Sequence, residues 1–322
     1  MLSPDPDFAR LADPYRRELL VHCYRMLGSF HDAEDAVQET YLRAWRAFDR
    51  FEGRSSVRTW LYRFATRACL TALESKARRV LPSGLGGPSG DGRAELGEHR
   101  TEIPWLEPLP DVAVRGEADD PATIASRRES TRLAFVAALQ TLPARQRAAL
   151  LLREVLEWPA AEVAELLEMS VPAVNSALQR ARTHLAAASP TEEQVAMDDS
   201  VDAEVLKRFI TAFETADISA LSLLLRHDVE LEMPPLAVWF NGRDAVAGFF
   251  EHRVLTGVVR RLVPVSANGC PAAATYQLED DGRFRAHSVQ VLETEDGEIT
   301  HIYAFLDIAI FAGFGLPEVW AD

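Results

Sequence analysis

The sequence predicts a multidomain protein with two all-α regions followed by an α+β region. Apolar residues recur at helical spacing from Leu11 to about residue 80 and again from Ile124 to Leu185. A glycine- and proline-rich stretch separates these two regions, and alternating strand-like runs dominate after Asp202. A chain of 322 residues has room for two or three domains. The expected organisation is a helical domain (1–80), a flexible acidic linker (81–123), a second helical domain (124–189), a short linker (190–201) and an α+β domain (202–322).

The negative charge of the chain is concentrated in its last third. The net charge is -15, of which -3 falls on residues 1–197 and -12 on residues 198–322. An even spread of negative charge would argue against a nucleic-acid binder, but the nearly balanced front can still carry basic surfaces.

Cysteine usage and the N-terminus predict a cytoplasmic protein. Cys23, Cys69 and Cys270 form no C-x-x-C pair and no Cys/His group at metal spacing, so reduced thiols, no metal and no cofactor are expected. Met1 is followed by Ser, Pro and Asp residues instead of a signal segment, and no apolar run is long enough to predict a membrane span.

The first helical region predicts a polar helix face beginning at Asp32. Inward positions are apolar, and the outward ones include Asp32, Asp35, Gln38 and Glu39. Carboxylates near a helix start stabilise the helix dipole. Dipole stabilisation and a docking face for a basic partner both fit this pattern.

Residues 51–79 are basic and contain interleaved aromatic residues. Such a surface suits a phosphate backbone with unstacked bases. Trp60, Leu61 and Phe64 are assigned to a core, which leaves the arginines and Tyr62 outside. The candidate DNA contacts of this stretch are Arg54, Ser55, Ser56, Arg58, Tyr62, Arg63 and Arg67.

The linker of residues 81–123 opens with P-S-G-L-G-G-P-S-G-D-G and then becomes acidic. Trp105, Leu106 and Leu109 lie among prolines and are expected to dock on another part of the chain. An acidic tether suits two roles, shielding a basic surface or lying along a basic channel.

Residues 160–185 predict a helix-turn-helix. A short helix over residues 160–167 is followed by Glu168-Met169-Ser170 and then by a second helix, for which Ser170 is a suitable N-cap. The buried stripe of the second helix is Val174, Leu178, Ala181 and Leu185.

The outward face of this second helix contains residue types that read base edges. Asn and Gln pair with adenine and Arg pairs with guanine or phosphate, whereas an ordinary helical hairpin would merely have a solvated face. The candidate contacts are Pro172, Asn175, Ser176, Gln179, Arg180 and Arg182.

The last region predicts two helices and then a curved antiparallel sheet. The expected strands cover residues 229–233, 262–266, 272–278, 285–292 and 299–306, with a helix over residues 242–253. Asp280-Asp281-Gly282 and Glu295-Asp296-Gly297 are turn signals between consecutive strands.

Three motifs of the first two regions resemble the sigma-70 family, in its extracytoplasmic-function type. They are D-A-E-D-A-V-Q-E-T (32–40), F-E-G-R-S-S-V-R-T-W-L-Y-R (51–63) and L-P-A-R-Q-R-A-A-L-L-L-R-E-V (142–155). The resemblance implies a non-enzymatic factor that binds the RNA polymerase core, on the β′ clamp helices and the β subunit, and directs it to promoter DNA. It implies that residues 51–79 melt and read the minus-10 element and that residues 171–182 read the minus-35 element.

The chain departs from the sigma-family pattern at several DNA-facing positions. Arg67 and Thr71 stand where the family often has Asn and Asp, and Glu168 replaces a frequent Gly of the turn. Asn175 and Ala177 stand where basic residues are frequent. These differences leave the promoter sequence open and predict fewer phosphate contacts.

The last third resembles a SnoaL-like domain of the NTF2-like superfamily, a fold with a cone-shaped cavity. The resemblance lies in residues 209–221, 233–246 and 304–317 and implies a domain that modulates the factor, with a small ligand as one means. The candidate pocket residues are Trp239, Tyr276, His287, Tyr303 and Asp307.

Two other functions fit parts of the sequence. His287 or His301 beside Asp307 would form an acid/base pair in a SnoaL-type enzyme, with the front as a DNA-binding passenger. A one-component repressor would bind duplex DNA without polymerase.

Overall fold

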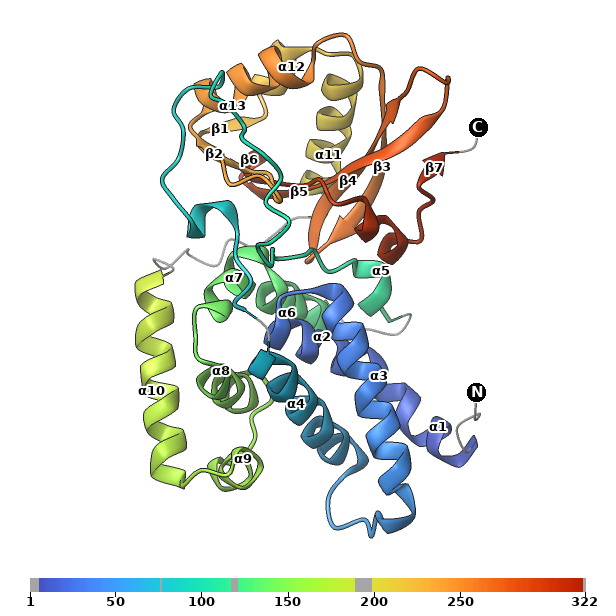
Figure 1. The fold of residues 1–322 in the computed structure, drawn as a ribbon, viewed down its shortest axis with the longest axis vertical. Helices are drawn as coiled ribbons and strands as arrows, with labels where there is room; N and C mark the ends of the chain where they lie inside the picture. Colours follow the sequence, from blue (N-terminus) through green and yellow to red (C-terminus); the bar gives the residue numbers. More distant parts are fainter. Residues whose placement is uncertain (1–5, 76, 117–120, 189–198, 321–322) are drawn as a thin grey trace. The chain divides into compact units, whose positions relative to one another are not determined.

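The computed structural model describes residues 6–75, 77–116, 121–188 and 199–320. The chain divides into two compact units (Figure 1). The first unit comprises Met1–Arg79 and Val114–Glu192, and the second comprises Val80–Ala113 and Glu193–Asp322. Both predicted helical regions therefore lie in one unit, and the chain between them belongs mainly to the other.

The first unit is all helical. Its helices are α1 (Pro6–Ala12), α2 (Arg16–Leu27), α3 (Phe30–Ala47), α4 (Val57–Ser75), α6 (Pro121–Thr131), α7 (Leu133–Gln140), α8 (Ala144–Leu150), α9 (Ala160–Leu167) and α10 (Val171–Ala188). Helices α2, α3 and α4 pack on one another, and α8 packs against both α4 and α10. Among the described residues, none of the helices has the length and apolar character that a membrane crossing needs.

Local sequence explains the helix boundaries. Gly28 ends α2 in the left-handed conformation, with φ 69°, and Ser29 then caps α3 by accepting a hydrogen bond from the Asp32 amide. Glu168 adopts the left-handed conformation at the end of α9, with φ 54°. The Ser170 hydroxyl accepts a hydrogen bond from the Ala173 amide at the start of α10. The predicted helix-turn-helix is therefore present.

The second unit is built on one sheet covered by helices on one face (Figure 1). The strands are β1 (Leu225–Glu232), β2 (Trp239–Asn241), β3 (Arg260–Ala267), β4 (Cys270–Leu278), β5 (Phe284–Glu295), β6 (Glu298–Phe305) and β7 (Val319–Trp320). The helices are α11 (Asp199–Glu214), α12 (Ile218–Ser222) and α13 (Arg243–Phe249), and α5 (Asp111–Val114) lies at the boundary of the units. The core under the helices contains Phe209, Leu231, Phe240, Leu292 and Ile302.

The strand order is β2-β1-β6-β5-β4-β3, with β7 pairing β5. The prediction of an antiparallel sheet is wrong at one place, because β1 pairs with β6 in parallel. After β1 and β2, the chain forms the β3–β6 meander, and the last strand of the meander, β6, pairs with β1. The pairing that joins the two parts of the sheet is therefore long-range in sequence. The Asp296-Gly297 turn is confirmed: both residues have positive φ, 51° and 81°, as a two-residue hairpin requires.

Residues 80–113, which overlap the predicted linker of 81–123 from residue 81 onward, belong to the second unit and meet both edge strands of its sheet. Ser89 forms a bridge with Phe240 on β2, and Pro110 forms one with Ala267 on β3. The amide of Asn268 donates to the Leu109 carbonyl at 2.9 Å, and the Asn268 side chain accepts from the Leu109 amide at 2.8 Å. The segment thus covers edges that would otherwise expose unpaired backbone groups. The flexibility of the linker stays a prediction.

Candidate functional site

The outward face of α10 is a continuous exposed polar surface. All six residues predicted as minus-35 contacts are exposed: Pro172, Asn175, Ser176, Gln179, Arg180 and Arg182. Val174, Leu178 and Ala181 are buried on the opposite side, as predicted. Arg180 donates to the Ser176 hydroxyl at 2.7 Å, one turn away, and Arg182 pairs with Glu154. A shallow groove lined by Gln179, Arg180, Thr183 and His184 follows this face.

The predicted docking face of α3 points outward except at Asp32, where the prediction of an outward side chain is wrong. Asp35 and Gln38 are exposed, whereas Asp32 and Glu39 are partly buried. Asp32 pairs with Arg79 at 2.6 Å, and only 12% of the aspartate side chain and 16% of the arginine side chain are exposed. Of the predicted contacts on this face, Asp32 is therefore the one held most firmly within the unit.

The basic residues around α4 are largely engaged in ion pairs. Arg58 pairs with Glu18 of α2 at 2.9 Å. Arg63 forms a bidentate pair with Glu165 of α9, at 3.0 and 3.2 Å. A pair between α4 and α9 joins the predicted minus-10 helix to the helix-turn-helix.

Four further predicted contacts, on α4 and in the loop before it, differ in their surroundings. Arg54 pairs with Glu52 and is exposed, and Arg67 is also exposed. Ser56 accepts a hydrogen bond from the Thr59 amide and so caps α4, next to the partly buried Ser55. The Ser56 hydroxyl thus stabilises the helix start.

The expectation that Tyr62 lies outside is wrong, because only 1% of Tyr62 is exposed. Its ring packs edge-on against His22 at 5.1 Å and Trp158 at 6.3 Å, and Arg58 lies over it. Burial raises the pKa of the Tyr62 hydroxyl. His22 and Trp158 are distant from Tyr62 in sequence, so the local pattern could not reveal these contacts.

His22 is the buried neighbour that holds α2 against α4. Its Nε2 atom lies 3.0 Å from the Thr66 hydroxyl, and 1% of the residue is exposed. Burial, assisted by the charges of Arg25 and Arg58, lowers the pKa of His22 to about 3. His22 is therefore neutral at physiological pH.

The aromatic residues beside the 51–56 loop form a cluster, of which sequence reasoning assigned Trp60 and Phe64 to the core. Phe51 packs on Trp60 with the rings tilted and their centroids 4.7 Å apart, and Trp60 meets Phe64 edge-on at 5.2 Å. All three are only partly buried. The i, i+4 spacing of Trp60 and Phe64 is the local signal that could have indicated an aromatic surface that is only partly covered.

In the second unit, the candidate pocket residues do not form one group. Trp239 and Tyr303 flank Glu232 in the register of β2, β1 and β6. Tyr276 is buried and donates to the Pro317 carbonyl, and His287 is exposed on β5.

Asp307 does not form the acid/base pair on which the alternative enzyme hypothesis depends. Asp307 is exposed, and its carboxylate accepts from the Ala309 amide as the cap of a short 3₁₀ helix. His301 instead meets Glu230 and Glu232.

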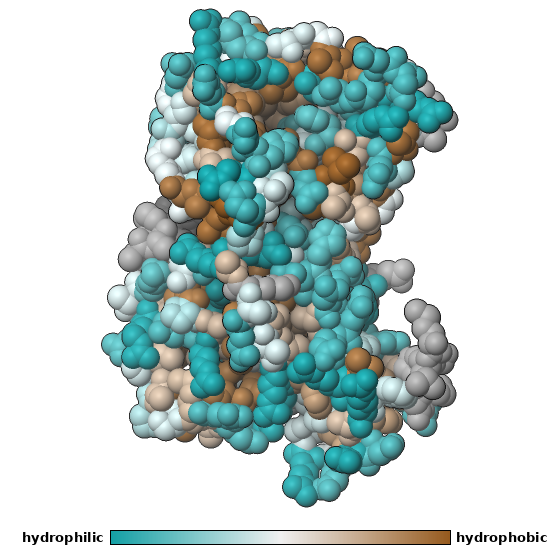
Figure 2. Space-filling view, viewed as in Figure 1, coloured by the Kyte–Doolittle hydropathy of each residue, from teal (hydrophilic) through white to brown (hydrophobic). Residues whose placement is uncertain are grey.

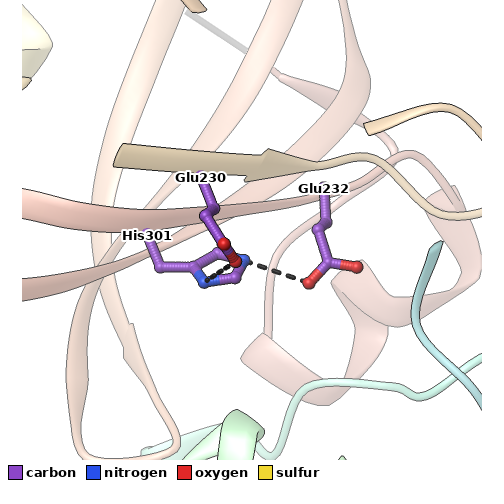
Figure 3. A group of neighbouring side chains, drawn as sticks. All are labelled: Glu230, Glu232 and His301. Carbon is purple, nitrogen blue, oxygen red and sulfur yellow. Dashed lines mark ion pairs between the residues drawn. The ribbon is translucent and has the colours of Figure 1, made fainter. Parts of the chain in front are cut away.

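Glu230, Glu232 and His301 form a cluster on one face of the sheet (Figure 3). The His301 Nδ1 atom lies 3.5 Å from Glu230 Oε2, and Nε2 lies 3.1 Å from Glu232 Oε1. Burial alone would lower the pKa of His301, but the carboxylates of Glu232, Glu293 and Glu230 outweigh it and raise that pKa. Sequence reasoning missed this cluster because its members lie about 70 residues apart.

Two helical modules, one of them a helix-turn-helix with an exposed polar helix, define a sigma-type promoter-binding protein joined to an α+β domain. Sigma-70 region 2 matches residues 11–79, and Sigma-70, region 4 matches residues 132–185. The SnoaL-like domain matches residues 206–302, as the resemblance implied.

The chain belongs to the extracytoplasmic-function (ECF) RNA polymerase sigma factors. It is 50% identical over 318 residues to the ECF RNA polymerase sigma factor SigG of Mycobacterium tuberculosis, covering 97% of this chain and 84% of SigG. SigJ of the same organism is 28% identical over 321 residues, 94% of this chain and 93% of SigJ. The crystal structure of SigJ has a similar fold, with a TM-score of 0.58 at 24% identity, covering 95% of this chain and 98% of SigJ.

As a sigma factor, the chain binds the RNA polymerase core and promoter DNA, and its SnoaL-like domain fits a modulatory role.

Proposed function

We propose that α10 reads the minus-35 element and that the face of α3 with Asp32, Asp35, Gln38 and Glu39 docks on the β′ clamp of the polymerase, in the cytoplasm. The exposed polar face of α10 carries the first assignment. A helix in the major groove presents its outward residues to base edges, and Asn175 and Gln179 offer the amide pairs that adenine accepts. Hydrophilic residues cover much of the visible surface of the first unit (Figure 2), as a surface for polar partners requires.

We infer that the minus-10 surface must be released before it works. Arg58 and Arg63 are paired with Glu18 and Glu165. The half-buried cluster of Phe51, Trp60 and Phe64 is the stacking surface for unpaired bases. Docking on the polymerase would separate α4 from α9 and transfer Arg63 from Glu165 to phosphate.

Transcription from a defined promoter tests this assignment. Core polymerase plus this chain should start at one site, and promoter DNA alone should bind the chain weakly. Tight binding of duplex promoter by the chain alone, with no gain in start-site selection by the polymerase, would favour a repressor and contradict the proposal.

We propose that the second unit modulates the factor by holding residues 80–113, the chain that joins the minus-10 and minus-35 modules. Ser83, Gly86 and Leu109 are anchored on Glu232, Trp239 and Asn268, respectively, through hydrogen bonds of 2.7, 2.8 and 2.8 Å. A held joining segment limits the separation that the two modules can adopt. No catalytic role is proposed for this unit, because its candidate histidine–aspartate pair is absent.

Gly92 offers a sharp test of this anchoring. A Cβ atom at Gly92 would lie 2.4 Å from the Phe249 amide nitrogen and 2.6 Å from the Ala245 carbonyl oxygen, so Gly92→Ala forces the segment away from α13. Gly90→Ala is the matched control, because a Cβ atom there meets nothing within 4 Å. We expect faster proteolysis within residues 80–113 and altered transcript levels for Gly92→Ala alone.

Deletion of residues 202–322 is the complementary test. Unchanged transcription, with the truncated protein equally abundant, would remove the regulatory role. Unchanged proteolysis of Gly92→Ala would remove the anchoring.

A further inference from the structure

The pairing of β1 with β6 brings two rows of polar side chains onto one face of the sheet. In one row, Glu230 of β1 is next to His301 of β6, which is next to Glu293 of β5. In the adjacent row, Glu232 is next to Tyr303. Residues two apart on a strand share a face, so these side chains converge. The intervening residues Leu231 and Ile302 belong to the core under the helices.

This face combines burial with an excess of negative charge. Only 1% of Glu232 and 7% of Glu293 is exposed. In the described part of the chain, the ion pairs of Glu230 and Glu232 are with His301 alone. Buried carboxylates are costly unless a cation compensates them, and the His301 imidazole carries at most one positive charge against the two carboxylates that it pairs with.

The Nε2 atom of His301 is available as a metal ligand. Its buried Nε2 atom makes no hydrogen bond, although Glu232 Oε1 lies only 3.1 Å away. One donor atom from each of Glu230, Glu232 and His301 lies within 4.8 Å of the others. Zinc bonds of about 2.1 Å place ligands about 3.4 Å apart in a tetrahedron. The 3.1 Å separation of His301 Nε2 and Glu232 Oε1 is already close to that spacing, and the Glu230 side chain, which lies beside Nδ1 and is 35% exposed, would complete the set by moving toward Nε2.

We propose that Glu230, Glu232 and His301 bind a first-row transition-metal dication such as Zn²⁺ in the second unit. Imidazole with two carboxylates is a donor set that such ions accept, whereas Ca²⁺ and Mg²⁺ prefer oxygen alone. Three protein ligands leave one position open for water or a small ligand. The Ser83 amide donates to Glu232 Oε2 at 2.7 Å, which orients this ligand and places the ion beneath the 80–113 segment.

The test uses the untagged full-length chain, stripped with EDTA and titrated with Zn²⁺ against a fluorescent chelator and with Co²⁺ by absorption. We expect one ion per chain and Co²⁺ d–d bands without a thiolate charge-transfer band. Glu232→Gln and His301→Gln should each weaken binding at least tenfold. His227→Gln is the matched control on β1, because the His227 side chain is 84% exposed and lies outside the cluster. It should bind as the unmodified chain does.

Circular dichroism of each variant separates loss of the site from loss of the fold. Glu230→Gln changes a side chain that is 35% exposed, so it keeps the test decisive if a buried variant fails to fold. The proposal is overturned by an absence of binding at equimolar metal or by equal affinity of the Gln variants and the unmodified chain. A thiolate charge-transfer band, which would assign the ion to a cysteine, or tighter binding of Ca²⁺ or Mg²⁺ would also overturn it.

Discussion

Helices α4 and α10 belong to the same unit, and both are predicted to contact promoter DNA, yet they present their polar residues differently. The six candidate residues of α10 are all exposed, and the helix is buried only along its apolar stripe. Around α4, Tyr62 is buried and Arg58 and Arg63 are paired with acids from other helices. The polar residues of α10 are accessible to a ligand, whereas those of α4 are engaged by other side chains of the same unit. This difference is the observation on which the proposed release step before minus-10 recognition rests.

We expect the largest effect from Arg147→Met, which tests the packing of the first unit. Arg147 lies on α8, the helix that contacts both α4 and α10. Arg147 is 3% exposed and donates to the carbonyls of Met26, Gln140 and Leu142 and to the Gln140 side chain. Leaving these acceptors unpaired should cost about 3 kcal/mol or more of unfolding free energy. Urea denaturation measures the loss, with the exposed Arg67→Met as control. Equal midpoints for both variants would contradict the packing argument.

The pH dependence of His22 probes the contact between α2 and α4. Its folded pKa is about 3 and its ordinary value is 6.5, so the unfolded chain takes up the proton first. The stabilisation is therefore complete above pH 6.5 and is lost as pH falls, by about 1.4 kcal/mol per pH unit toward the folded pKa. Denaturation at several pH values should show this slope, and His22→Gln should reduce it. If the unmodified chain and His22→Gln lose stability equally steeply as pH falls, the pH dependence does not come from His22.

Arg180→Ala tests whether the exposed face of α10 contacts promoter DNA. We expect promoter binding of the holoenzyme to weaken by about 1–3 kcal/mol, with relaxed preference at one base pair. Arg208→Ala removes the same charge from the exposed face of α11 and should have no such effect. A uniform loss across sequences, with a salt slope reduced by about one, would instead make Arg180 a phosphate contact.

Glu165→Gln should have the smallest effect, because its pair with Arg63 is partly solvated. Glu165 is 67% exposed and Arg63 29%, which limits the pair to below about 1 kcal/mol. Freed from Glu165, Arg63 should bind a single-stranded minus-10 oligonucleotide a few-fold more tightly in fluorescence anisotropy. Glu162→Gln on the same helix is the control. If neither variant binds more tightly, the pair does not restrain α4.

Local features of the sequence predicted much of the first unit. The apolar stripe of α10 and the cap at Ser170 depend on residues within one or two turns, so the sequence pattern predicts them without knowledge of the fold. Tyr62 was misplaced because its burial depends on His22 and Trp158, about 40 and 100 residues away. Arg63 was predicted to lie outside, but its side chain is only 29% exposed and pairs with Glu165, about 100 residues away.

The sequence by itself determined the class of each region, the helix-turn-helix and the strands between the turn residues, because periodicity and backbone preference act over short distances. Only the tertiary structure decided which polar residues are paired, which linker residues lie on the second unit, and that Glu230 and Glu232 meet His301. These contacts arise from a parallel pairing of β1 with β6 and from hydrogen bonds that span up to 159 residues. Long-range contacts of this kind are set by the packing of whole elements, which no local pattern encodes.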